Sequence, residues 1–151
     1  MSVWNDPEMG QYLPDASSDD MSEEEYQSQL KELETLGDDE ECCYLISELK
    51  ATGERIGACS FLPSEDGSIY DIGYCVHRTH WRNGYATEMV QGMIEYAKFQ
   101  GAKSITIMIT EGNIASERIA EKFGGRVVKT SSYVKKGTNL TFTDNMYEIK
   151  L

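Results

Sequence analysis

The sequence lacks the features that mark several large classes of protein. It has no uninterrupted apolar run approaching the roughly 18 residues that a membrane-spanning helix needs. Residues 1–6 carry neither the basic flank nor the apolar segment of a signal peptide. We therefore expect a cytoplasmic protein without a membrane partner. With 151 residues, 40% of them hydrophobic, the chain can bury a core as one domain over residues 1–151.

The few cysteines and histidines give no metal-binding pattern. The four cysteines are Cys42, Cys43, Cys59 and Cys75, and their spacing contains no CxxC pair. Two adjacent cysteines point to opposite faces of a strand, so Cys42 and Cys43 cannot share a metal. His77 and His80 have no acidic partner in register. We expect no metal site, and we interpret the cysteines as reduced, buried, small apolar residues.

Basic residues are scarce, and they are unevenly distributed. The net charge of -12 argues against nucleic acid as a partner, because phosphate binding requires a basic face. Residues 1–66 hold 18 acidic and 3 basic side chains, whereas residues 67–151 hold 8 acidic and 11 basic ones. This asymmetry suits a cationic substrate on one side and an anionic cofactor on the other, although acidic helices that only maintain solubility explain it equally well.

Periodicity and turn residues predict an alternating series of helices and strands. A capping box at Ser22 and Glu25 begins an amphipathic helix over about residues 19–36. The other expected elements are strands 41–50, 55–62 and 68–76, a helix opening at 84–86 and ending near 100–101, strand 105–109, helix 113–123, and a final hairpin turning at 136–139.

The order of these elements defines the fold class. Short turns join the first three strands into an antiparallel set, and strand 68–76 is apolar enough to be covered on both faces. A helix then separates it from strand 105–109, which indicates a parallel βαβ crossover. We expect a mixed α/β domain with a largely antiparallel sheet, in which this crossover carries the loop around Gly84.

The loop before the second helix is a candidate anion site. Backbone N–H groups at a helix N-terminus are unpaired and lie at the positive end of the helix dipole. Gly84 has no Cβ and Ala86 is small, so a pyrophosphate can approach the backbone. The Walker motif and the GxGxxG dinucleotide motif are both absent, as is the GxSxG motif of serine hydrolases.

Several ordered motifs resemble the GNAT acetyltransferase superfamily, especially its branch of ribosomal-protein alanine N-acetyltransferases and polyamine acetyltransferases. They are Asp71-Ile72-Gly73-Tyr74, then Trp81 and Gly84-Tyr85-Ala86-Thr87-Glu88, then Asn113-x-x-Ser116 and Glu121-Lys122-Phe123-Gly124. The resemblance runs from about Tyr12 to the C-terminus. It departs from the general pattern at Trp81, where Gln or Arg is usual, and at Arg78, where Pro is frequent.

The resemblance implies acetyl-CoA as cofactor and assigns residues to it. The CoA pyrophosphate would lie on the backbone amides of Arg82, Asn83, Gly84, Tyr85, Ala86 and Thr87. The main chain of Val76 would pair with the pantetheine arm, Asn113 would orient that arm, and Lys122 could neutralise a CoA phosphate. A solvated helix lysine is the simpler interpretation of Lys122.

The implied reaction is transfer of acetyl from acetyl-CoA to a primary amine by direct attack. The amine is a small cation or a peptide N-terminus; a catalytically silent acyl-CoA sensor is the alternative. Burial within an apolar strand would raise the pKa of Asp71, which makes it the first candidate base, with Glu111 as the second. Ser116 is the implied thiolate partner, although its hydroxyl could instead cap a helix. Tyr133 and Tyr147 are fallback acids that could equally be packing residues.

The chain departs from the superfamily at its beginning. Only about 40 residues precede the first expected strand, where superfamily members have a further strand and a longer helix. A sheet without that leading strand has an edge that needs cover, and we therefore expect a possible homodimer.

Overall fold

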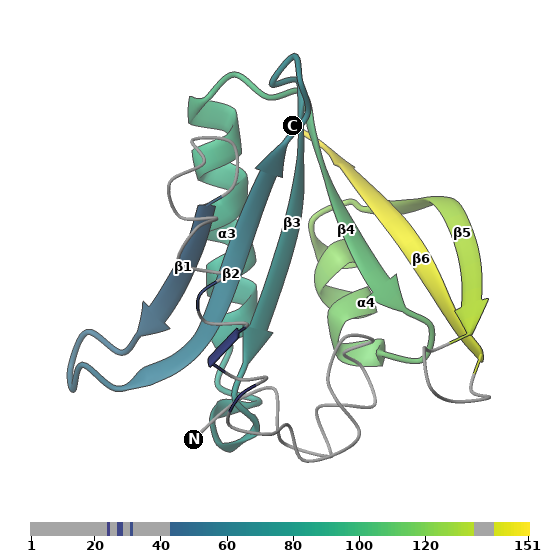
Figure 1. Ribbon diagram of the computed structural model, residues 1–151. Helices are drawn as coiled ribbons and strands as arrows, with labels where there is room; N and C mark the ends of the chain where they lie inside the picture. Colours follow the sequence, from purple (N-terminus) through teal and green to yellow (C-terminus); the bar gives the residue numbers. More distant parts are fainter. Residues whose placement is uncertain (1–23, 25–26, 29–30, 32–42, 135–140) are drawn as a thin grey trace.

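The computed structural model describes residues 24, 27–28, 31, 43–134 and 141–151. Within them, six strands form one sheet in the order β1-β2-β3-β4-β6-β5, with two helices and a short 3-10 turn (Figure 1). The strands are β1 Cys43–Glu48, β2 Arg55–Pro63, β3 Ile69–Val76, β4 Ser104–Thr110, β5 Arg126–Val134 and β6 Thr141–Lys150. The helices are α3 Tyr85–Phe99 and α4 Ile114–Lys122, and the 3-10 turn is η2 Arg78–His80.

The predicted order of elements is confirmed in the described residues. β1 and β3 each pair antiparallel with β2, which lies between them, and β3 pairs in parallel with β4 across α3, so the mixed α/β class is correct. The helix expected over residues 19–36 lies largely outside the described residues, although Glu24, Gln27, Ser28 and Lys31 are helical. The turn expected at 136–139 also lies outside them, but the strands on either side pair antiparallel.

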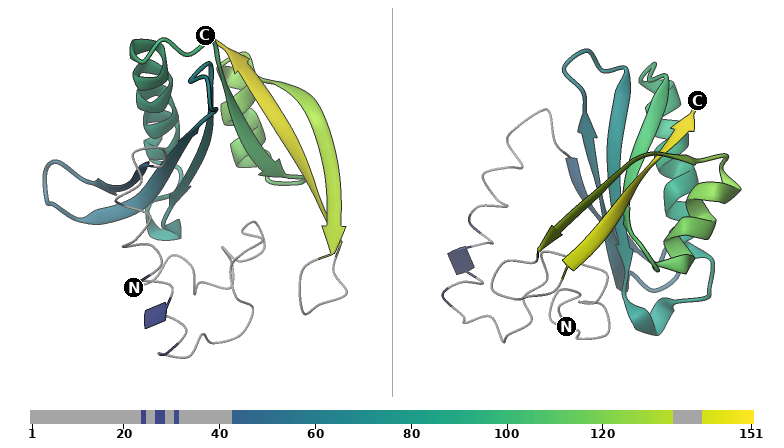
Figure 2. Two further views of the ribbon diagram at one scale, coloured as in Figure 1. Left: turned by 45° about the horizontal axis from the view of Figure 1, so that its top comes forward. Right: turned by 90° about the vertical axis from the view of Figure 1, so that its right-hand side faces the viewer.

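Both helices cover the same face of the sheet (Figure 2). The apolar side of α3 is buried through Val90, Met93, Ile94 and Ala97, as its helical periodicity predicts. These side chains form one core cluster with residues of β3, β4, β6 and α4, among them Ile72, Ile105, Ile107, Ala120, Tyr147 and Ile149. Among the described residues, no helix is long and apolar enough to cross a bilayer.

The sheet opens into a V between its two central strands. β3 and β4 pair only where Ile69–Asp71 lies beside Ser104–Thr106. Beyond that point β3 follows β2 and β4 follows β6, so the two strands diverge towards the end of the molecule that carries η2 (Figure 1). Among the described strands, none lies beside the main-chain groups inside the V, which leaves these groups available to a ligand.

The prediction that β3 is covered on both faces is wrong for the described part of the chain. Ile69 and Asp71 are exposed on the face opposite the helices. Exposed apolar side chains on the same face, which we call the open face, include Tyr44, Ile46, Leu62 and Met108. The physical reason is that α3 and α4 both pack on the other face.

One further expectation, that the cysteines are core residues, is only partly met, and the expected lack of a leading strand concerns residues outside the described part and stays a prediction. Cys59 and Cys75 are free and half-buried rather than core residues, while Cys42 and the side chain of Cys43 lie outside the described part. β1 is the first strand of the described residues, and it forms one edge of the sheet.

Candidate active site

The loop between β3 and α3 has the geometry of an anion site. Gly84 is the N-cap of α3 with φ 84°, a left-handed conformation that favours glycine, and it provides no capping side chain. The first bond of the helix runs from Glu88 N to Gly84 O over 3.0 Å. The amides of Tyr85, Ala86 and Thr87 therefore precede the helical ladder and lie at the positive end of its dipole.

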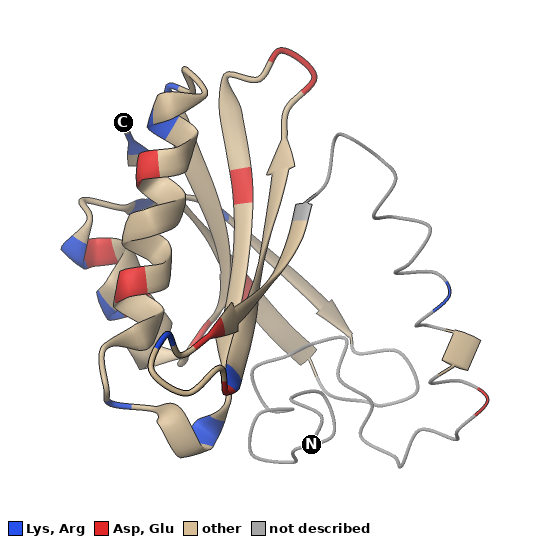
Figure 3. Cartoon of the chain, turned by 90° about the vertical axis from the view of Figure 1, so that its left-hand side faces the viewer, with Lys and Arg blue, Asp and Glu red and all other residues tan. Residues whose placement is uncertain are grey.

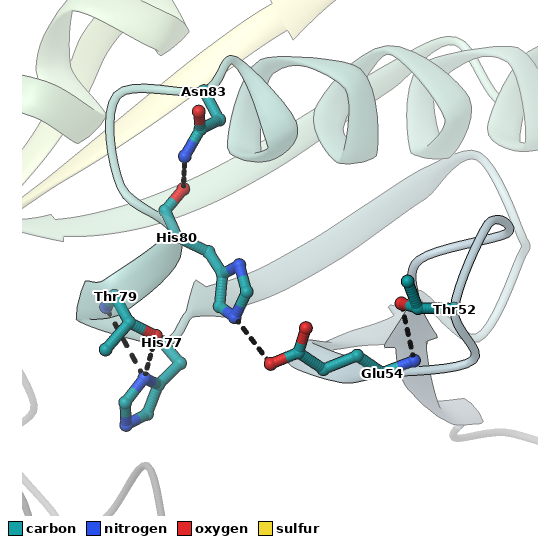
Figure 4. Close-up of polar contacts among 6 residues, drawn as sticks. All are labelled: Thr52, Glu54, His77, Thr79, His80 and Asn83. Atoms are coloured by element: carbon teal, nitrogen blue, oxygen red, sulfur yellow. Dashed lines mark hydrogen bonds and ion pairs between the residues drawn. The ribbon is translucent and has the colours of Figure 1, made fainter.

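Short-range bonds fix the shape of this loop. The Trp81 indole Nε1 donates to Val76 O over 2.7 Å, which ties the loop to the strand end. Asn83 Nδ2 donates to His80 O over 3.0 Å (Figure 4). The same Nδ2 donates to Trp81 O over 3.1 Å. Arg82 takes a left-handed φ of 62° between them. The amides that would meet a pyrophosphate are thus held in place before any ligand binds.

A second contact joins the loop to the hairpin of β1 and β2. His80 Nε2 lies 3.2 Å from Glu54 Oε1, and His77 Nδ1 lies 2.8 Å from Thr79 Oγ1 (Figure 4). The sequence alone gave His80 no acidic partner, and the fold provides one from another element. In addition to these contacts, Arg78 and Arg82 give the loop two positive charges (Figure 3).

At the end of β3, some backbone N–H and C=O groups point into the V. His77 N donates to Ile56 O over 2.7 Å, and hydrogen-bonded pairs alternate along an antiparallel ladder. Val76, opposite Gly57, and Tyr74 therefore direct their main-chain groups away from β2 and towards the opening. Because the Trp81 indole already occupies the carbonyl of Val76, the groups left to an incoming arm are the Val76 amide and the amide and carbonyl of Tyr74.

Asp71 lies at the apex of the V, on the open face. Thr106 Oγ1 donates to Asp71 Oδ1 over 2.6 Å from the adjacent strand. Partial burial raises the pKa of Asp71, and the bond from Thr106 opposes that rise. Val76 lies five positions after Asp71 along the strand, a distance of about 16 Å at roughly 3.3 Å per residue. The candidate base and the phosphate site therefore occupy opposite ends of the V.

The start of α4 borders the V on the β4 side. Asn113 is the N-cap of α4, and its Oδ1 accepts from Ser116 N over 3.3 Å. The alternative in which the Ser116 hydroxyl caps the helix is therefore wrong, because Asn113 takes that position. Ser116 lies in the first turn, where unpaired amides and the helix dipole favour negative charge.

The remaining predicted residues lie farther from this arrangement. Glu111 is exposed on the β4–α4 loop, and its amide donates to Thr143 O over 2.8 Å. Lys122 is in the last turn of α4, with Nζ 6.0 Å from the centre of the Phe123 ring. That position is about 13 Å from the N-terminal end of the nine-residue helix. Its role towards a CoA phosphate stays a prediction.

The two fallback tyrosines occupy packed positions. Tyr133 stacks on Phe142 with ring centres 6.0 Å apart. Tyr147 belongs to the core and is 7% exposed, and burial raises the pKa of its phenol. Both positions favour the packing interpretation over a role as acid.

Sequence reasoning gave no role to Tyr74, which lies on the helix face of β3 and packs against the core cluster. Its hydroxyl is buried without a hydrogen-bond partner among the described residues. Burial raises the pKa of this phenol, and the Ser116 side chain opposes that rise. Strand alternation could have placed Tyr74 on the helix face, but it gives no sign that its hydroxyl is buried without a partner.

A cavity of about 430 Å³ lies between β1, β2 and α3. None of the predicted site residues lines it. The lining residues are Leu45, Ser47, Cys59, Phe61, Met89, Gly92, Met93 and Tyr96. The cavity is therefore distinct from the glycine loop and the V.

Comparison with known proteins shows the family to which this chain belongs. Residues 1–126 match the acetyltransferase (GNAT) domain family. YkkB of Bacillus subtilis (strain 168), described as uncharacterized, is 40% identical over 89 residues, which span 56% of this chain and 51% of YkkB. The chain thus matches about half the length of that relative.

Solved structures share the fold. A GNAT-family acetyltransferase of Bacillus anthracis aligns with TM-score 0.78 at 21% identity, over 98% of this chain and 84% of that one. The microcin C7 self-immunity acetyltransferase MccE, solved in complex with acetyl-CoA and AMP, aligns with TM-score 0.77 at 16% identity, over 99% and 83%. With the family match covering most of its length, the chain belongs to the GNAT acetyltransferase family.

Proposed function

We propose that the protein transfers an acetyl group from acetyl-CoA to the nitrogen of a primary amine. One observation carries the proposal: the V between β3 and β4 opens onto a preformed anion site at one end and holds a carboxylate at its apex. The donor fits this arrangement in both charge and length, because its phosphates are anionic and its arm is elongated. When bound, acetyl-CoA supplies an activated thioester carbonyl.

The chain's own groups can hold such a donor. The amides from Arg82 to Thr87 would face the pyrophosphate, with the charge of Arg82 beside them. The Val76 amide and the main chain of Tyr74 would pair with the arm inside the V. Asn113 borders the same opening, where its side chain already caps α4.

Asp71 is the proposed base. A carboxylate with a raised pKa accepts a proton from an ammonium more readily than an ordinary surface aspartate does. It faces the open face, from which an amine can approach the apex of the V without crossing the donor. Glu111 is the second candidate because it lies on the loop that leads into α4. Ser116 would stabilise the departing sulfur.

The acceptor is proposed to be a small cationic amine or a peptide N-terminus. The acidic excess of residues 1–66 favours a cation, and the exposed apolar side chains of the open face can contact its carbon skeleton. A homodimer is also proposed, because β1 presents a sheet edge flanked by exposed Leu45 and Ile46. Light scattering at micromolar concentration should give twice the chain mass; a monomer would contradict the dimer.

A thiol-release assay tests the proposed function. Purified protein is mixed with acetyl-CoA and a panel of polyamines, aminoglycosides and short peptides, and free CoA is measured with a disulfide reagent. The proposal expects amine-dependent release of CoA. Binding of acetyl-CoA in calorimetry with no release for any amine would instead identify an acyl-CoA sensor.

A further inference from the structure

The open face of the sheet carries a buried carboxylate that the proposed chemistry does not use. Asp144 of β6 is 8% exposed, and it is the one acidic side chain among the buried polar residues of the described part of the chain. Its pairing with Thr110 of β4, and strand alternation from Tyr147 in the core, place it on the same face as Asp71. Thr110 Oγ1 donates to Asp144 Oδ1 over 2.9 Å, as Thr106 of the same strand donates to Asp71. Both carboxylates are therefore held beside β4.

The buried charge of Asp144 is incompletely compensated. A carboxylate has about four lone-pair sites, and the neutral hydroxyl of Thr110 occupies one of them. Among the described residues, no ion pair joins Asp144 to a basic side chain, and Lys129, which lies opposite Met146 on β5, makes none with it. Burying a charge without a counter-charge costs free energy. The position therefore favours a cation from outside the chain.

A second carboxylate on the same face of β6 shows how the chain can supply a counter-charge. Lys150 Nζ donates to Glu148 Oε1 over 2.6 Å, from a position two residues farther along the strand. The residue two positions after Asp144 is Met146, which carries no charge. Glu148 thus has an ammonium group from its own strand, whereas Asp144 has none from the described part of the chain.

The open face is apolar between Asp71 and Asp144. Met108 of β4 pairs with Met146 of β6, and Met108 is 45% exposed. The register places Asp144 four positions farther along β4 than Asp71, about 13 Å at roughly 3.3 Å per residue. Methionine side chains adapt their shape to an apolar group that lies on them. The order of carboxylate, methionine pair and carboxylate matches a linear amine with two ammonium groups and a hydrocarbon chain between them.

We propose that Asp144 binds a second ammonium group of the acceptor and so selects linear amines with two or more positive charges. This inference rests on the proposed function, in which the reacting amine lies at Asp71. As the C–N bond forms and the C–S bond breaks, Asp71 takes the proton of the amine and CoA leaves as the thiolate. Asp144 neither gains nor loses a proton and contacts no reacting atom. It determines which acceptor reaches Asp71 in the correct position.

Turnover with a series of amines tests this selection. Butylamine, putrescine and spermidine are compared in the thiol-release assay on the wild type and on Asp144→Asn, which keeps the size of the side chain and the oxygen that Thr110 reaches. Asp144→Asn should raise KM for spermidine about 10- to 100-fold, the strength of a charged hydrogen bond, with kcat unchanged because Asp71 remains. Butylamine has one charge and putrescine is too short to reach both carboxylates, so their KM values should not change.

Two further variants separate the charge of Asp144 from its place in the fold. Met146→Lys keeps Asp144 and reproduces the spacing of Glu148 and Lys150, so an ammonium group of the chain should occupy the carboxylate and raise KM for spermidine as Asp144→Asn does. Glu148→Gln is the matched control, because it neutralises a carboxylate on the same face of the same strand that Lys150 already occupies, and KM should not change. Thermal unfolding of Asp144→Asn should give the Tm of the wild type or a higher one, because a neutral amide costs less to bury than a charge.

Calorimetry with spermidine in the presence of CoA gives a readout that needs no turnover. The wild type should bind spermidine more tightly than butylamine, and Asp144→Asn should lose that difference. Four results would overturn the inference: no binding of spermidine by the wild type, an equal KM for spermidine in wild type and Asp144→Asn, an equal loss in Glu148→Gln, or a dependence on Asp144 for lysine-containing peptides but not for spermidine. If the wild type binds spermidine through Asp144 but releases no CoA with any amine, the proposed function fails while Asp144 stands as a cation site.

Discussion

The two ends of the V are built by different kinds of contact. At the loop end, the bonds within the loop join residues two to five positions apart, such as Trp81 with Val76 and Asn83 with His80, and the contact of His80 with Glu54 is an exception to this locality. At the apex, the bond crosses between strands, with 35 positions separating Thr106 from Asp71. The end proposed for the donor is thus largely local in sequence, whereas the end proposed for chemistry depends on assembly of the whole sheet.

The largest expected effect is at the apex. Asp71→Asn removes the proposed base while preserving size, so kcat should fall about 100- to 1000-fold with affinity for acetyl-CoA unchanged. Steady-state kinetics and calorimetry measure the two quantities separately. Glu65→Gln, an exposed neutralisation just before β3, is the control and should behave as wild type. Full activity of Asp71→Asn would show that Asp71 is not the general base and would leave Glu111 as the candidate.

At the loop end, Gly84→Asp should lower affinity for acetyl-CoA about 100-fold. The substitution adds a negative charge to the anion site and strains a residue at φ 84°. Gly101→Asp is the matched control, because Gly101 has φ 86° and follows the opposite end of α3. Equal affinities in calorimetry for wild type and Gly84→Asp would remove the loop from the cofactor site.

The close approach of β2 to the end of β3 can be tested by measuring the free energy of unfolding. A Cβ on Gly57 would lie 2.1 Å from Cys75 O, so Gly57→Ala must push β2 away from the end of β3. We expect a loss of about 2 kcal/mol in urea unfolding. Gly92→Ala should instead gain about 1 kcal/mol, because Gly92 lies within α3 with no atom near its added Cβ. Equal effects of the two changes would contradict the close approach.

The smallest effect concerns pH. Thr106→Val removes the hydrogen bond that lowers the pKa of Asp71, so the acid limb of the kcat/KM profile should move to higher pH. Ionisation of Asp71 changes the free energy of unfolding in the opposite direction to ionisation of an ordinary paired carboxylate. Because folding raises this pKa above 3.8, ionisation of Asp71 weakens the fold as the pH rises through the raised value. A profile that is unchanged by Thr106→Val would exclude Asp71 as the titrating base.

The same contrast explains what could be predicted from the sequence. The start of α3 at Tyr85 and the anion site followed from Gly84 and helical periodicity, which are local signals. The partners in the pairs His80–Glu54 and Asp71–Thr106 come from different elements, and one sequence gives no sign of which residues will meet. The exposed face of β3 was missed for a related reason, since an apolar pattern does not tell which face the helices will cover.

The hydrogen bond from the Trp81 indole to Val76 O places a fluorescent side chain at the end of β3, so tryptophan fluorescence can report on the loop. The chain has two tryptophans, Trp4 and Trp81, so replacing Trp4 by phenylalanine leaves a single emitter at the strand end. Trp81 is 42% exposed and hydrogen-bonded at Nε1, and both polarity and that bond affect indole emission. A ligand that enters the V beside Val76 changes the surroundings of this one fluorophore. Occupancy of the loop can therefore be followed in real time without a label on protein or cofactor.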